Sequence, residues 1–148
     1  MKKLIAMIFI SAAAFLAVPK AHAQGQQSLK NAAGRALDTV TNTGTKTMTS
    51  PVITGRIAGV TVTESTTNIS GTQSGIARLF GSLDGVTYHR VRSTMLHNSQ
   101  VDSLVITTAP TAQNYAWFVD GNPFNYYQIQ VTGVGTVSFS VKGKIKSN

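Results

Sequence analysis

The sequence has no cysteine, few prolines and few charged residues. Without thiols the chain forms no disulfide and has neither a thiolate nucleophile nor a thiolate metal ligand. Charged residues make up 12% of the 148 residues and apolar residues 42%, a balance that favours a packed core over a disordered chain. A chain of this length is enough for one domain and too short for two.

Acidic residues are scarce as well, since five Asp and Glu stand against thirteen Lys and Arg and give a formal charge of +8. Three of the basic residues, Lys2, Lys3 and Lys20, lie at the N-terminus. Without them the net charge is +5, which attracts polyanions such as nucleic acid or anionic surface glycans. The remaining basic residues are scattered, apart from Lys142, Lys144 and Lys146, so the composition does not favour nucleic acid as a partner.

Residues 1–23 have the parts of a cleavable signal peptide. A charged start precedes an apolar run at 4–18, and small residues at Ala21 and Ala23 precede Gln24. The run is about 15 residues long, shorter than the ~20 that span a bilayer, which argues against the alternative of an uncleaved anchor. We expect a protein exported to the periplasm, the cell surface, the medium or a virion, with no stable membrane span after cleavage.

Residues 24–50 are expected to form a short helix and a connector. Apolar residues from Ser28 to Val40 recur at helical spacing, with Ser28 as the N-cap. Such a helix either lies against the rest of the domain or docks to a partner subunit, and the candidate assembly residues are Leu29, Ala33 and Leu37. The Thr-rich connector 41–50 could pair as an edge strand.

Residues 51–148 are expected to form an all-β domain, an antiparallel, jelly-roll-like β-sandwich of seven or eight strands. Turn signals separate the strands at Leu83–Val86 and at Asp120–Pro123. The polar stretch 64–75 is interpreted as a loop. The predicted strands are 57–63, 76–83, 87–93, 101–108, 115–119 and the two arms of a closing hairpin at 125–146.

The closing hairpin alternates strictly between apolar and polar residues, as half-buried strands do. The predicted core face holds Tyr127, Ile129, Val131, Val137, Phe139, Val141 and Ile145. The outward face is the candidate contact surface, and it holds Tyr126, Gln128, Gln130, Lys142, Lys144 and Lys146. The three lysines have a second interpretation, as charges that protect an edge strand against aggregation.

Aromatic residues gather between Tyr115 and Tyr127. Some of them must be core, since aromatic side chains bury large areas. Tyr126 is expected to point outward, where it would pack on another subunit or stack on a sugar ring.

No constellation of residues points to catalysis or metal binding. His89 and His97 could approach Asp84 and Asp102, but no nucleophile motif accompanies them. Glu64 and Asp120 complete the set of acids available for glycoside hydrolysis, and the Asp-Gly turns account for Asp84 and Asp120. We expect no catalytic residue, no metal site and no cofactor.

Two segments resemble known proteins. Residues 80–88, FGSLDGVTY, followed by Val91, resemble a "G-S-x-D-G-x-x-Y/W-x-x-V" hairpin found in discoidin-like carbohydrate-binding domains and in bacteriophage virion proteins. The ending from Tyr127 to Gly133 and from Val137 to Ile145 resembles the closing hairpin of the same phage proteins. The resemblance implies a β-sandwich with a structural or a carbohydrate-binding role.

Two functions therefore stay open. The first is an exported, non-enzymatic structural or assembly protein, a virion or cell-surface component that associates with itself or with other structural subunits. The alternative is a secreted or periplasmic carbohydrate-binding module.

Overall fold

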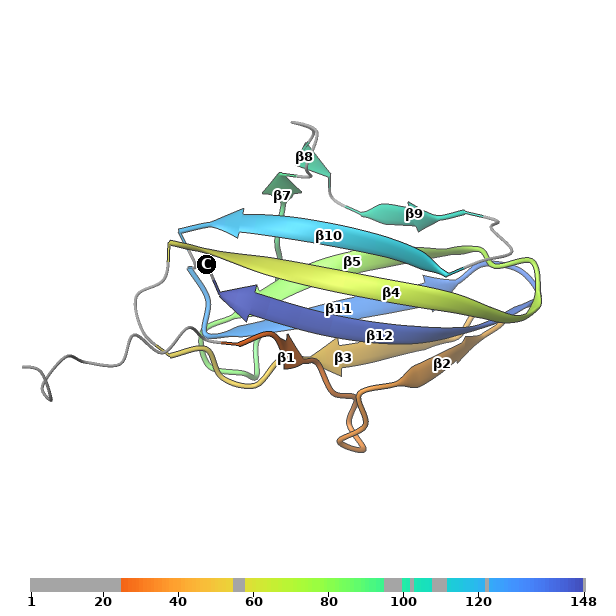
Figure 1. The fold of residues 1–148 in the computed structure, drawn as a ribbon, viewed down its shortest axis with the longest axis horizontal. Helices are drawn as coiled ribbons and strands as arrows, with labels where there is room; N and C mark the ends of the chain where they lie inside the picture. The colour runs from red at the N-terminus through yellow and green to blue at the C-terminus, as the bar shows by residue number, and fades with distance from the viewer. Residues whose placement is uncertain are drawn as a thin grey trace, which may run out of the picture.

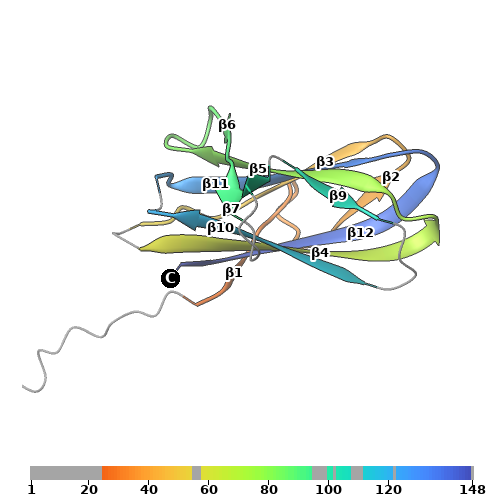
Figure 2. The same ribbon diagram turned by 90° about the horizontal axis from the view of Figure 1, so that it is seen from above.

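The computed structural model describes residues 25–54, 58–94, 100–101, 103–107, 112–121 and 123–147. These residues form two antiparallel sheets that pack face to face (Figures 1 and 2), and none of them is helical. The predicted all-β sandwich is confirmed. The predicted signal peptide lies outside the described residues. Within them, no helix is long and apolar enough to cross a membrane.

The strands divide unequally between the sheets. Sheet A has seven, in the order β1 (Gln27–Ser28), β12 (Val137–Ser147), β4 (Gly59–Gly71), β10 (Gln113–Asp120), β7 (Ser93–Thr94) and β8 (Gln100–Val101), with β2 (Asp38–Thr41) also paired to β12. Sheet B has five, in the order β3 (Thr45–Thr49), β11 (Tyr126–Gly133), β5 (Gly75–Ser82) and β6 (His89–Arg90), with β9 (Leu104–Ile106) also paired to β5. Consecutive long strands lie in alternate sheets, as in a jelly-roll-like arrangement: β4, β10 and β12 are in sheet A, and β5 and β11 are in sheet B.

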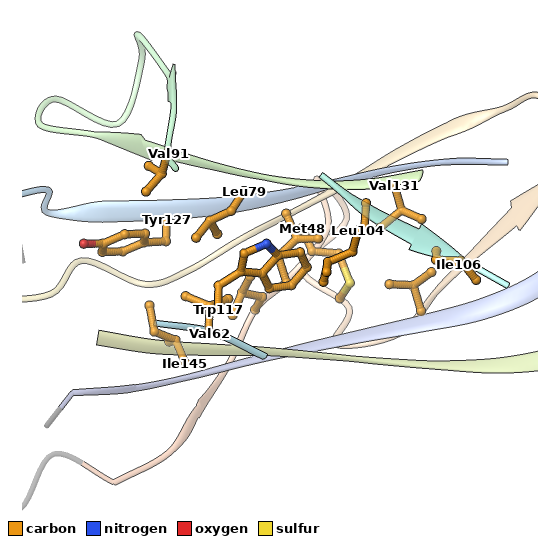
Figure 3. Packing of buried hydrophobic residues seen from close by; sticks show 14 of the residues in the cluster. Met48, Val62, Leu79, Val91, Leu104, Ile106, Trp117, Tyr127, Val131 and Ile145 are labelled. Atoms are coloured by element: carbon orange, nitrogen blue, oxygen red, sulfur yellow. The ribbon is translucent and has the colours of Figure 1, made fainter. Parts of the chain in front are cut away.

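The core lies between the sheets and is built by alternate residues of the long strands. Figure 3 shows Trp117 at the centre of the cluster, between Val62 of sheet A and Leu79 of sheet B. The predicted core face of the last two strands is confirmed, because all of its members are buried: Tyr127, Ile129, Val131, Val137, Phe139, Val141 and Ile145.

The prediction that β11 and β12 pair as a hairpin is wrong. β11 lies in sheet B between β3 and β5, whereas β12 lies in sheet A between β4 and the two short strands β1 and β2. Alternation shows which face of a strand is buried, and both strands do face the same core, but it does not show which strand is the hydrogen-bonded neighbour. β12 is not the last strand of sheet A, and Lys144 is paired with both β4 and β1, so the edge-protection interpretation is wrong for this lysine.

The predicted N-terminal helix is also wrong, because Ser28–Val40 forms the end of β1, a loop and the start of β2. The side-chain Oδ1 of Asn31 accepts hydrogen bonds from the backbone N–H groups of Ala33 and Arg35, at 3.0 and 2.9 Å. Such local bonds compete with a helix for the same donors. Leu29 is buried, Ala33 is exposed and Leu37 is 45% exposed, so these three residues share no face.

Residues on either side of the predicted domain boundary belong to one sandwich. The Thr-rich connector supplies β3, which pairs with β11 as the edge strand that its composition allows. The predicted loop 64–75 is wrong in its larger part, since β4 continues to Gly71 and pairs with both β10 and β12. Its many Ser and Thr residues suggested a loop, but β-branched Thr also suits a strand.

Candidate binding surfaces

The outer surface of sheet B brings together three of the predicted contact residues. Tyr126, Gln128 and Gln130 alternate with the buried residues of β11 and therefore point away from the core. The register places Gln128 opposite Phe80 and Gln130 opposite Arg78 on β5, on the same side of the sheet. We call these five residues the sheet B face. It combines two partly exposed rings with amide and guanidinium groups.

A protruding hairpin borders the sheet B face at one end. Residues 83–88 join β5 to β6 and project from the sheet (Figure 2). Leu83 and Val86 are 64% and 82% exposed there. The Tyr126 ring packs beside Gly85, where an added Cβ would lie 3.2 Å from the ring. The hairpin therefore extends the sheet B face with two exposed apolar side chains.

Tyr88 ties the hairpin to the sheet B face. Burial raises the pKa of Tyr88, a hydrogen bond with Thr49 lowers it, and the nearby Tyr126 phenol raises it further, so that the net change is upward. Gln128 donates a hydrogen bond to Thr49 Oγ1 at 3.3 Å, so the sheet B face is also bonded to β3.

Asp84 holds the hairpin turn. Its Oδ1 accepts hydrogen bonds from the backbone N–H groups of Thr87 and Val86 and from the Ser82 hydroxyl, each at 2.8 Å. These bonds, with Thr87 contributing most, lower the pKa of Asp84 to about 2. Gly85 has a φ of 75°, in the left-handed region that glycine adopts without strain. The contacts of Asp84 are therefore those of a turn residue, as expected from the sequence. His89 is exposed on β6, and the other candidates His97 and Asp102 lie outside the described residues.

The lysines of the predicted contact face lie on sheet A instead. Lys142, Lys144 and Lys146 are exposed residues of β12 that point away from the core. The predicted face is therefore divided between the two outer sides of the sandwich. The prediction placed these residues on one surface because it assigned β11 and β12 to a single hairpin.

Two of these lysines border a pocket of about 530 Å³. β1 and β2 pair with different parts of β12, and the chain between them forms a loop that hangs beside β12 (Figure 1). Lys142 and Lys144 line one wall, and Arg35, Asn31 and Asp38 belong to the loop side. We call this hollow the basic pocket. Lys146 does not line it.

The acid in the basic pocket is already engaged. Asp38 Oδ2 accepts a hydrogen bond from Asn31 Nδ2 at 3.0 Å, and Oδ1 lies 3.7 Å from Lys46 Nζ. Burial raises the pKa of Asp38, but the bonds from Asn31 and Thr39 and the charge of Lys46 outweigh it and lower the pKa overall. Asp38 and Lys46 thus form an ion pair at the edge of the basic pocket.

A buried acid lies inside the sandwich, where sequence reasoning placed a loop. Glu64 is 1% exposed, and burial raises its pKa to about 8. Neither carboxyl oxygen has a hydrogen-bond partner among the described residues. Thr66 follows on the same side of β4 and accepts a hydrogen bond from Gln73. The signal that would have found Glu64 is the alternation Val60, Val62, Glu64, Thr66, which continues the predicted strand.

Comparisons with known proteins show a shared fold. No family model and no curated protein matches the chain. Solved structures with similar folds include the enzymatically active domain of tailspike protein 4 from bacteriophage CBA120, with 9% identity and a TM-score of 0.51 over 76% of this chain. The PBSX exported protein XepA has 9% identity and a TM-score of 0.52 over 85% of this chain, and a CBM4 structure has 8% identity and a TM-score of 0.47 over 86%.

The matched structures differ in how much of their own length this chain covers. This chain spans 15% of the tailspike chain, 38% of XepA and 81% of the CBM4 chain. Likenesses at such low identity concern the arrangement of strands. The chain has a β-sandwich fold of the kind found in phage tailspike and phage-exported proteins.

Proposed function

We propose that this chain is an exported, non-enzymatic structural or assembly protein, a component of a virion or of a cell surface. The observation that carries the proposal is the pair of exposed apolar residues, Leu83 and Val86, in a turn whose Gly85 lies against the Tyr126 ring. Apolar and aromatic side chains that gather at one place on the surface are typical of the central part of a protein contact. Tyr and Arg are also enriched at such contacts.

The hairpin suits this role because it is held in shape before any partner arrives. Asp84 fixes the turn through three hydrogen bonds, and Gly85 leaves room for the Tyr126 ring. A surface ordered in advance loses less conformational entropy on association.

Light scattering after size-exclusion chromatography tests the proposal on residues 24–148. We expect multimers with a defined mass. A clean monomer at all accessible concentrations would contradict self-association.

Carbohydrate binding is the second candidate, and the composition of the sheet B face favours it. Phe80 and Tyr126 offer rings for stacking, while Gln128, Gln130 and Arg78 offer amide and guanidinium groups to sugar hydroxyls. Binding sites that combine apolar surface with a few polar groups suit such ligands. A glycan array with the wild type and Tyr126→Ala tests it. Defined multimers without glycan binding would exclude this candidate.

A further inference from the structure

The basic pocket on sheet A lies on the opposite side of the sandwich from the sheet B face, and the proposed function does not use it. We propose that it binds an acidic saccharide, with Arg35, Lys142 and Lys144 holding the anionic groups. The volume of about 530 Å³ lies in the range of small-ligand sites.

The first argument is the charge balance of the pocket walls. Three cations and a single acid line the pocket, and the charge of that acid is already paired with Lys46. No ion pair in the described part of the chain involves Arg35, Lys142 or Lys144. Their positive charge therefore remains available to a ligand.

The second argument is the rigidity of both walls. Lys142 and Lys144 are alternate residues of β12 and are both paired with β4, and Lys144 is also paired with β1, so their Cα atoms are held about 7 Å apart. Arg35 is fixed by its backbone N–H, which donates to Asn31 Oδ1 at 2.9 Å, and by its carbonyl, which accepts from Asn31 N at 2.9 Å. The backbone that carries the three cationic side chains is therefore ordered on both walls of the pocket.

The third argument concerns the kind of anion. Asp38 uses its oxygens for Asn31, Thr39 and Lys46, but a carboxylate has about four acceptor positions, so one remains for a hydroxyl donor. An acidic sugar has negative charge for the cations and also hydroxyl donors for Asp38. A phosphodiester group has the negative charge but no donor for Asp38. Among the described residues no aromatic side chain lines the pocket, so a ligand would be held there by charge and hydrogen bonds and not by ring stacking.

Calorimetry with four probes of equal length tests the proposal on the chain from Gln24. The probes are a galacturonic acid hexamer, a heparin hexasaccharide, maltohexaose and an oligothymidylate. We expect one or both acidic saccharides to bind, and their relative affinity tells whether carboxylate or sulfate is preferred. Binding should weaken as the ionic strength rises, because surface charges are screened.

Matched variants locate the site. Lys142→Thr and Lys144→Thr should each weaken binding roughly tenfold, as expected for the loss of one charged hydrogen bond. Lys146→Thr removes the same charge from the same side of the same strand but outside the pocket, and it should leave binding unchanged.

Several results would overturn the proposal. They are an absence of binding to either acidic saccharide, equal or tighter binding of maltohexaose or oligothymidylate, and an equal loss in Lys146→Thr. The subunit contact is tested separately, because Val86→Asp should leave saccharide binding intact and Lys144→Thr should leave the multimer intact.

Discussion

Glu64 is the residue at which burial and charge conflict most strongly. Its carboxyl group lies in the core with neither oxygen hydrogen-bonded among the described residues, and burial raises its pKa to about 8. The native state therefore holds this group protonated at neutral pH, since burying an unpaired carboxylate costs far more than burying the neutral acid. Glu64 also adds to the upward shift of the pKa of Tyr115, which comes mainly from burial.

This conflict predicts the pH dependence of stability. In the unfolded chain the pKa of Glu64 returns to the reference value of 4.5. The native state thus binds more protons between pH 4.5 and about 8, so the free energy of unfolding is highest below this window, falls across it and levels off above it. The slope contributed by one such group is at most about 1.4 kcal/mol per pH unit.

Urea unfolding of the wild type and Glu64→Gln between pH 5 and pH 8 measures the effect. Glutamine has nearly the same shape and does not ionise, so the variant should lose most of the decline. Asp38 and Asp84 have lowered pKa values and contribute below this window with the opposite sign. An equal decline in both proteins would show that Glu64 is not responsible.

The hydrogen bonds of Asp84 predict a local effect on the exchange of neighbouring amides. Asp84→Ala removes the acceptor for the N–H groups of Val86 and Thr87, and amide hydrogen exchange at these two positions should become faster. Asp84→Asn keeps a side-chain oxygen in place and should retain much of the protection. Unchanged exchange in the alanine variant would mean that the hairpin holds its shape without this side chain.

At the scale of elements, the segment that replaces the expected helix closes one side of the sandwich. Leu29 donates its backbone N–H to Gly143 of β12 at 2.9 Å, and Lys30 forms a bridge with Thr49 of β3. The segment therefore links the two sheets. The Leu29 side chain packs over Gly143, where an added Cβ would lie 3.2 Å from it.

This packing makes Leu29 and Leu37 a matched pair. Leu29 is 0% exposed, and Leu29→Ala should lower the free energy of unfolding by about 2–5 kcal/mol. Leu37 is 45% exposed, and Leu37→Ala should change it by less than about 0.5 kcal/mol. Denaturant unfolding measures both. Similar effects of the two variants would contradict the placement of Leu29 in the core.

Gly81 on β5 leaves space for an aromatic ring. A Cβ at this position would overlap Phe124, whose ring packs edge-on against Tyr127 with centroids 6.0 Å apart. Gly81→Ala should therefore destabilise the protein by about 1–3 kcal/mol. The cost should fall when Phe124 is replaced by Leu, which a double-mutant cycle measures.

Gly25→Ala is the control for this cycle, since nothing lies within 4 Å of its Cβ position. If the cost of Gly81→Ala is the same with and without Phe124, the ring is not its cause.

Elements also show how far the sequence predicts the structure. The alternation of β11 and β12 predicts every buried apolar side chain of these strands, because the period of two along a strand depends on that strand alone. Their assignment to different sheets depends on contacts with β4 and β5, which no local pattern contains. The helix prediction failed because apolar spacing at 28–40 does not reveal that Asn31 bonds its own turn.

At the scale of the whole molecule, the sandwich displays two unlike surfaces on opposite sides. The sheet B face joins rings and amides to an apolar hairpin, and sheet A carries the basic pocket. The sequence predicts which side chains of β11 and β12 point outward, since these positions follow from alternation. It does not predict Arg35 beside Lys142 and Lys144, because a loop far away in sequence forms that wall.

The contact made by the 83–88 hairpin is the central claim, and light scattering over a concentration series of matched variants tests it most directly. Val86→Asp adds a charge to the exposed hairpin, whereas Val105→Asp adds it to an exposed residue of β9, which is 63% exposed. We predict multimers for the wild type and Val105→Asp and monomers for Val86→Asp. Multimers that persist in Val86→Asp, or a wild type that is monomeric throughout, would contradict the account.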